Sequence, residues 1–97
     1  MTKLSVLDLM IGEGKSFTDT LTDARLLARH VEQHGYQRYW IAEQHDLPGI
    51  ASSASTLLVS NLGTAPPRTL RVGAGGIMLP NHSSLMVAEQ FATLETL

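Results

Sequence analysis

Two apolar runs that each end abruptly in polar residues constrain the fold of this chain more than any other feature. The first, residues 38–45, ends in Glu-Gln-His; the second, residues 70–82, thins to glycine and ends in Pro-Asn-His. A helix-like segment precedes each run, so the runs predict parallel strands whose polar ends share one edge of a sheet. Ligands bind at that carboxyl edge in parallel α/β folds. The pattern therefore favours an enzyme scaffold.

The order of apolar patterns along the chain predicts the succession βαβαβα. Segments with apolar residues at three- and four-residue steps are typical of helices, and short continuous apolar runs are typical of buried strands. The predicted strands lie near residues 4–9, 38–43 and 70–77, and the predicted helices cover residues 17–34, 53–62 and 85–97.

Polar residues and prolines mark several of these boundaries. Ser16 and Asp19 have the spacing of a capping box, which satisfies free amide groups at a helix start. Ser83 or Ser84 can cap the third helix in the same way, and Pro66-Pro67 forbids helix ahead of the third strand.

The length of each βα unit indicates the architecture. Three units in 97 residues are about 32 residues each, and eight such units make the ~250 residues of a (β/α)₈ barrel. The helical pattern of residues 85–97 also stops without a glycine, proline or polar cap. We therefore expect an α/β fold, with residues 1–97 as the truncated amino-terminal portion of a TIM barrel, in its first three βα units. The alternative is a small three-layer α/β domain that closes its sheet edges by oligomerisation.

Composition excludes several function classes. The net charge is −2 and the seven Lys and Arg residues are scattered singly, so we expect no nucleic-acid partner. The chain has no cysteine, and His30 and His34 lack the His-Glu-x-x-His pattern, so we expect no metal site. No apolar run reaches membrane-spanning length. We expect a cytoplasmic protein with no membrane partner.

The strand ends hold the candidate catalytic residues. Glu43 and His45 are two apart, so in an extended segment they point to the same side, whereas Gln44 points away. A carboxylate beside an imidazole can fix its tautomer and form a general acid–base pair. The alternative is that both residues only cap the strand. Asp8 lies at the corresponding end of the first strand.

The glycines of residues 73–76 suggest a site for a flat ligand. Neither a dinucleotide fingerprint nor a P-loop is present, because Met78 stands where a glycine is needed and no Lys-Ser/Thr follows. Gly75-Gly76 inside a strand predicts a bulge or the close approach of an aromatic ring system. The alternative is that glycine only makes room for a facing helix.

Four segments in register carry a family resemblance: residues 40–45, 49–52, 75–83 and 88–94. In order and spacing they resemble the amino-terminal third of the bacterial luciferase-like flavin monooxygenases, and within that family the alkanal-monooxygenase-like branch. The resemblance covers essentially the whole chain.

The resemblance implies a (β/α)₈ barrel that uses reduced FMN, bound or supplied by a flavin reductase, and oxygen to oxidise a small organic substrate. Related barrels use deazaflavin F420 instead, and a non-catalytic half-barrel that acts only in association is the remaining alternative. Homodimers are common in the family, and Val87, Phe91 and Leu94 on the third helix are the expected contact. Phosphate-gripping loops come late in such barrels, so the 97 residues alone are expected to be inactive.

Residue by residue, Gly75 and Gly76 match the place where the family has an irregular, often cis peptide beneath the flavin ring. Ala74 and Asp8 fall beside it as further cofactor-binding candidates. Glu43 and His45 match the first and last positions of the family's Glu-His-His motif. Gln44 replaces the middle histidine, which luciferases use in catalysis, and an amide cannot act as a base near neutral pH. Light emission is therefore not implied.

Overall fold

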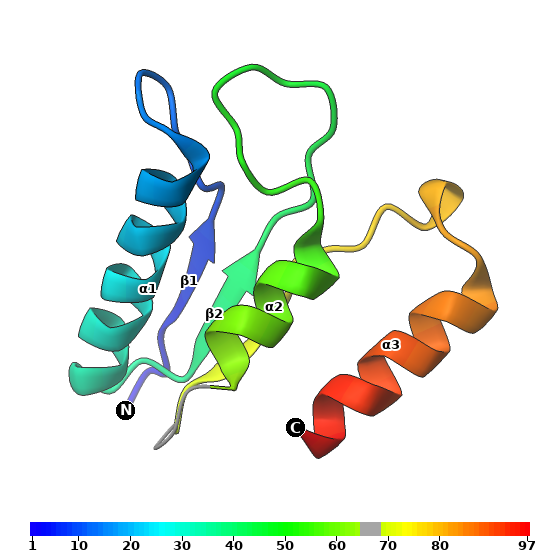
Figure 1. The fold of residues 1–97 in the computed structure, drawn as a ribbon. Helices are drawn as coiled ribbons and strands as arrows, with labels where there is room; N and C mark the ends of the chain where they lie inside the picture. Colours follow the sequence, from blue (N-terminus) through cyan, green and yellow to red (C-terminus); the bar gives the residue numbers. More distant parts are fainter. Residues whose placement is uncertain (65–68) are drawn as a thin grey trace.

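A three-stranded parallel sheet with its connecting helices forms the described part of the chain. The structure, a computed structural model, describes residues 1–64 and 69–97. In chain order the elements are β1 (Ser5–Asp8), α1 (Phe17–Gln33), β2 (Arg38–Ile41), α2 (Ser55–Gly63), β3 (Arg71–Ala74), the 3₁₀ turn η1 (Leu79–Asn81) and α3 (Ser84–Thr96). Figure 1 shows α1 and α2 running alongside the strands and α3 set apart from α1 at the other side of the molecule.

The strand order is β1-β2-β3, and both pairings are parallel. Leu7, Trp40 and Gly73 lie side by side in register across the three strands. Each strand is followed by a helix, so the predicted alternation and the parallel pairing are both confirmed.

Serine side chains begin two of the helices, as the sequence predicts. The Ser16 hydroxyl accepts a hydrogen bond from the Asp19 amide at 3.1 Å, and the Ser83 hydroxyl accepts one from the Met86 amide at 3.1 Å. Such caps satisfy amide groups that have no partner within the helix and contribute about 1 kcal/mol each. The predicted break at Pro66-Pro67 lies outside the described residues.

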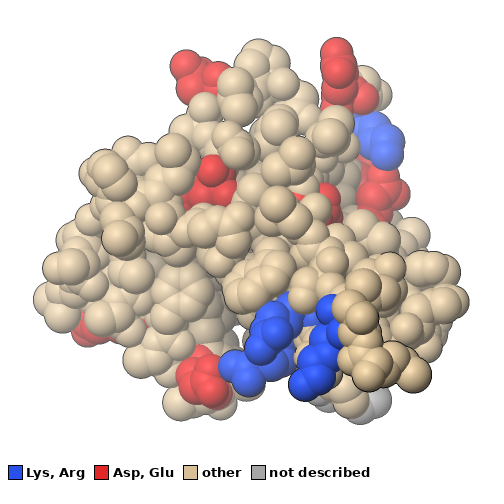
Figure 2. Space-filling model, turned by 180° about the vertical axis from the view of Figure 1, so that it is seen from behind, with Lys and Arg blue, Asp and Glu red and all other residues tan. Residues whose placement is uncertain are grey.

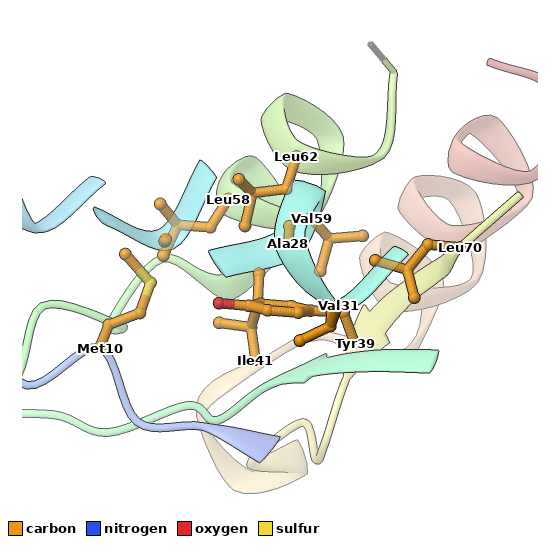
Figure 3. Packing of buried hydrophobic residues seen from close by; sticks show 10 residues of the cluster. Met10, Ala28, Val31, Tyr39, Ile41, Leu58, Val59, Leu62 and Leu70 are labelled. Atoms are coloured by element: carbon orange, nitrogen blue, oxygen red, sulfur yellow. The ribbon is translucent and has the colours of Figure 1, made fainter. Parts of the chain in front are cut away.

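The core fills the space between the sheet and the helices α1 and α2. Figure 3 shows the Tyr39 ring lying across this cluster, with Ala28 of α1 and Leu62 of α2 nearby. Tyr39 and Ile41 are fully buried, because alternate residues of β2 point toward the helices. Burying an aliphatic side chain of this size contributes about 1.5–3 kcal/mol. These apolar contacts are the main source of stability for the described chain.

The opposite face of the sheet has no covering helix in the described part of the chain. Leu7 of β1 remains 58 % exposed there, and its register partner Trp40 is half-buried. Seen from behind, most of the molecular surface is uncharged, and Lys and Arg side chains gather at its lower edge (Figure 2). Arg38 and Arg71, paired in register at the amino ends of β2 and β3, are both exposed.

The Trp40 side chain accounts for two glycines, one on the neighbouring strand β3 and one just after it. A Cβ atom at Gly73 would lie 2.9 Å from Cζ3 of the Trp40 indole, and one at Gly75 would lie 3.0 Å from the Trp40 Cβ. The first distance is shorter than real Cβ contacts, and the second is at the tight end of their range. The neighbour for which these glycines make room is thus a side chain of the adjacent strand rather than a facing helix.

Three predicted boundaries are wrong. The second strand ends at Ile41, two residues before the predicted residue 43. The third strand is predicted to reach residue 77, but β3 ends at Ala74. The Gly75 amide makes the last hydrogen bond to β2, to the Ile41 carbonyl at 2.9 Å, and the chain then leaves the sheet. Gly75 and Gly76 therefore follow the strand instead of forming a bulge inside it. Helix α2 begins at Ser55, two residues later than expected, and no side chain caps its start.

Part of the apolar side of helix α3 faces the core. Leu94 packs against the core cluster, and Phe91 and Leu94 line a hollow beside β3. The more exposed apolar residues of this helix are Leu85 and Met86. Val87, Phe91 and Leu94 are all half-buried, and the expected dimer contact through them stays a prediction. Within residues 1–64 and 69–97, no helix combines the length and apolarity required to span a membrane.

Candidate active site

A buried carboxylate that binds two imidazoles forms the most distinctive polar cluster of the structure. The Glu43 side chain is fully buried. One of its oxygens lies 2.5 Å from Nε2 of His45, and Nε2 of His82 lies 2.9 and 3.0 Å from the two oxygens. The backbone amide of Met78 donates a further hydrogen bond at 3.2 Å. We call Glu43, His45 and His82 the carboxylate–histidine cluster.

These hydrogen bonds decide the charge of Glu43. Burial by itself raises the pKa of a carboxyl group, because it removes water from the charged form. The hydrogen bonds from His45, His82 and the Met78 amide outweigh burial and hold the pKa of Glu43 below its usual value. Glu43 is therefore ionised at neutral pH and acts only as a hydrogen-bond acceptor.

Paired loops at the carboxyl edge of the sheet position the cluster. Glu43 follows the last residue of β2 by two positions, and the Gln44 amide donates to the Ser52 carbonyl at 3.0 Å. The loops after β1 and β2 are joined by an antiparallel bridge between Ile11 and Ile50. This pairing fixes the loop from which His45 projects toward Glu43.

Asp8 lies at the same sheet edge but makes its hydrogen bonds on the helix-covered face. Its carboxylate accepts hydrogen bonds from the Tyr39 hydroxyl and, at 2.7 Å, from the Met10 amide. Met10 is a buried residue with φ of +50°, a conformation that non-glycine residues rarely adopt. Asp8 therefore supports the turn after β1. Burial, followed by the hydrogen bond to Asp8, raises the pKa of Tyr39.

The candidate cofactor-binding glycines differ in their surroundings. The peptide bond between Gly75 and Gly76 is cis, as the family resemblance implies. A Cβ atom at Gly76 would meet nothing within 4 Å, whereas Gly75 is packed under Trp40. Ala74 packs against the hydrophobic core on the helix-covered face. Of these residues, Gly76 offers open space for a ligand.

The structure brings together some of the residues singled out from the sequence and separates others. Glu43 and His45 are hydrogen-bonded, as their two-residue spacing predicts. Gln44, which lies between them in the sequence, is half-buried, and its backbone amide donates to the Ser52 carbonyl within the loop. Asp8 bonds to Tyr39 and Met10 instead of joining the carboxylate–histidine cluster.

His82 is the site residue that sequence reasoning missed. It stands 39 positions from Glu43, and the only signal for it is its place at the polar end of the third apolar run. The chain reaches it through the turn η1, where the His82 amide donates to the Leu79 carbonyl at 3.0 Å. Position at a strand end was therefore a better guide than spacing between histidines.

Chemically, the cluster is suited to handling protons. The His45 and His82 side chains are 41 % and 28 % exposed, so both can be reached from solvent while Glu43 stays covered. Among residues 1–64 and 69–97 no group of three or more His, Cys, Asp or Glu side chains is arranged to hold a metal ion. An ionised carboxylate that orients imidazoles is the arrangement used in general acid–base catalysis.

Three βα units with such a cluster at the carboxyl edge of the strands define a fragment of an α/β enzyme fold. The sequence profile of the luciferase-like monooxygenase family matches residues 4–97. The chain belongs to this family.

Known relatives agree with this assignment. A luciferase-like monooxygenase of Escherichia coli (strain K12) is 51 % identical over 94 residues, which are 96 % of this chain and 28 % of that relative. The N-acetyl-S-alkylcysteine monooxygenase of Bacillus subtilis (strain 168) is 45 % identical over 98 residues, covering 100 % of this chain and 29 % of the relative. The chain thus spans less than a third of the length of these proteins.

A solved structure shows the same fold. The crystal structure of apo-MsnO8 superposes with a TM-score of 0.90 at 36 % identity, and the match covers 99 % of this chain and 29 % of MsnO8. The predicted fold class, a partial (β/α)₈ barrel with its first three βα units, is confirmed.

Proposed function

We propose that this chain is the amino-terminal part of a flavin-dependent monooxygenase, which uses reduced FMN and oxygen to oxidise a small organic substrate. Family membership supports oxidation by oxygen. The flavin proposal rests mainly on one observation, the short chain distance between the exposed backbone at Gly76 and the carboxylate–histidine cluster. The Met78 amide, two residues beyond Gly76, donates directly to Glu43.

The residues present fit a flat ring system. Gly76 is exposed, and the position of its missing side chain is empty. The ring would lie against the backbone of Gly75 and Gly76, with the uncharged face of the sheet around Trp40 and Leu7 beside it. Reduced flavin, when bound, supplies the electrons that activate oxygen. The remaining contacts belong to parts of a whole barrel beyond these three units.

The polar side chains have separate tasks in this proposal. His45 is the partly exposed imidazole that moves a proton at the substrate, and Glu43 holds it in place. Gln44 can donate or accept a hydrogen bond but cannot move a proton near neutral pH. The proposed chemistry is therefore oxidation without the histidine that luciferases carry at this position.

The name of the Bacillus subtilis relative suggests where to look for a substrate. N-acetylated S-alkylcysteines are small organic thioethers, and we take them as the first compounds to test. A flavin reductase that supplies reduced FMN and assembly as a homodimer in the cytoplasm belong to the same proposal.

The first experiment is a cofactor titration of the intact natural protein. Binding of oxidised and reduced FMN and of F420 is followed by absorbance and fluorescence. We expect FMN to bind, and oxygen consumption with reduced FMN to rise when substrate is added. Binding of F420 alone would replace the monooxygenase with a hydride-transfer enzyme, and binding of neither would refute the proposal.

A matched pair of glycine variants tests where the ring lies. In Gly76→Ala the new methyl group enters the space assigned to flavin, and overpacking of about 1–3 kcal/mol corresponds to a loss of affinity of roughly 5- to 150-fold. The control is Gly63→Ala, at the last residue of α2. Its methyl group makes ordinary contact with Val72 at 3.6 Å. We expect unchanged FMN affinity in the control. Equal affinities in both variants would place the ring elsewhere.

A further inference from the structure

The carboxylate–histidine cluster contains one acceptor and two imidazoles that meet it through the same ring atom. Both His45 and His82 approach Glu43 with Nε2, at 2.5 Å and 2.9 Å. The fourth member of the arrangement is the Met78 amide, a donor that cannot change its role. The hydrogen-bonding pattern of the cluster therefore depends on where the imidazole protons sit.

Ionised Glu43 has no proton to donate. A hydrogen bond needs one proton between the two heavy atoms, so each Nε2 that faces this carboxylate must carry it. The backbone amide of Met78, which can only donate, meets the same carboxylate and fits the role of Glu43 as an acceptor. A neutral imidazole has only one N–H group, so its other ring nitrogen, Nδ1, is then left with a free lone pair.

The Nδ1 atoms are available for chemistry. Within the described ranges 1–64 and 69–97, neither His45 nor His82 forms a hydrogen bond through Nδ1. Both side chains are partly exposed, whereas Glu43 is not. In each ring, the Nδ1 atom therefore lies on an edge that is not bonded to Glu43.

We infer that Glu43 is a positioning residue that locks both imidazoles in the Nε2–H tautomer, so that Nδ1 of His45 and Nδ1 of His82 are the two proton acceptors of the site. His82 thereby becomes a second proton carrier beside His45. Its catalytic part rests on the proposed function, whereas the tautomer assignment depends on the cluster alone. A proton taken up at either Nδ1 makes that ring an imidazolium, whose Nε2–H remains bonded to Glu43.

Nuclear magnetic resonance of the intact protein tests the tautomers without any cofactor. Long-range ¹H–¹⁵N spectra of ¹⁵N-histidine-labelled protein, recorded above about pH 8 where imidazole is ordinarily neutral, distinguish Nε2–H from Nδ1–H rings. We expect His45 and His82 both to be Nε2–H. An Nδ1–H ring at either position in the natural protein overturns the inference, and this measurement needs no variant.

Glu43→Gln supplies the second measurement. A glutamine amide has one oxygen that accepts and one NH₂ group that donates, so it cannot accept at both former oxygen positions. The Met78 amide can only donate and meets Oε1, so the glutamine oxygen should take that place and its NH₂ group should face Nε2 of His45. His45 should then switch to Nδ1–H in order to accept at Nε2. The control is Glu89→Gln on the exposed surface of α3, which should leave both tautomers unchanged. Retention of both Nε2–H rings in Glu43→Gln contradicts the assigned role of Glu43.

The catalytic part is tested by His82→Gln. The glutamine NH₂ group can still donate to Glu43 from the place of Nε2, but nothing replaces the Nδ1 lone pair. Loss of one general base costs on the order of 10²–10⁴ in rate. We expect FMN affinity to be unchanged and substrate-dependent oxygen consumption to fall by this factor. A rate equal to that of the natural protein overturns the role of His82. Absence of FMN binding in the natural protein would instead refute the proposed function and leave the tautomer test intact.

Discussion

Substitution of Gly73 by alanine should destabilise the protein through one contact across the sheet. The new Cβ atom would lie 2.9 Å from Cζ3 and 3.2 Å from Cε3 of the Trp40 indole. Either the ring or the strand must move.

The magnitude follows from two opposing contributions. Overpacking of this kind costs about 1–3 kcal/mol, while replacing glycine stiffens the unfolded chain and returns about 0.4–1 kcal/mol. Taking the middle of each range, we expect a net loss of about 1.3 kcal/mol in the free energy of unfolding. The measurement is urea-induced unfolding of the intact protein, followed by circular dichroism and tryptophan fluorescence.

A double-mutant cycle isolates the contact. Trp40→Leu removes the ring atoms that meet the new methyl group, so Gly73→Ala should cost little or nothing in that background. Gly63→Ala, at the end of α2, is the control, because its Cβ meets only Val72 at an ordinary 3.6 Å and helix propensity favours alanine. The explanation fails if Gly73→Ala has the stability of the natural protein, or if its cost is the same with and without Trp40.

Two further predictions concern ionisation. Tyr39→Phe should lower the free energy of unfolding by about 1–3 kcal/mol, because an oxygen of Asp8 loses its donor. It should also reduce the loss of stability of the natural protein above about pH 10, where tyrosine ionises in the unfolded but not the folded state. An equal alkaline loss in both proteins would contradict this. The lowered pKa of Glu43 stabilises the folded state at neutral pH, and this stabilisation is lost as the pH falls below about 4.5. Between pH 7 and pH 4, the free energy of unfolding in urea should therefore fall less for Glu43→Gln than for the natural protein. An equal fall in both proteins would refute this contribution of Glu43.

The order of elements could be predicted from the sequence because it depends on local patterns. Apolar periodicity along the chain gave three strands and three helices, and the serine caps at Ser16 and Ser83 were correct because a cap involves residues only three positions apart. The contact between Glu43 and His45 was predictable for the same reason, since side chains two apart on an extended segment share a side.

The tertiary structure decided which distant residues meet. His82 reaches Glu43 across 39 positions, and Tyr39 draws Asp8 to the helix-covered face, because strand register and the path of the loops bring these atoms together. Likewise, Gly73 is required by Trp40 of the neighbouring strand, a partner fixed by the pairing of β2 with β3. The residue pattern by itself determines conformation over a few positions. Contacts between residues on different strands form only when the strands pair in register and the apolar faces of α1, α2 and the sheet pack into one core.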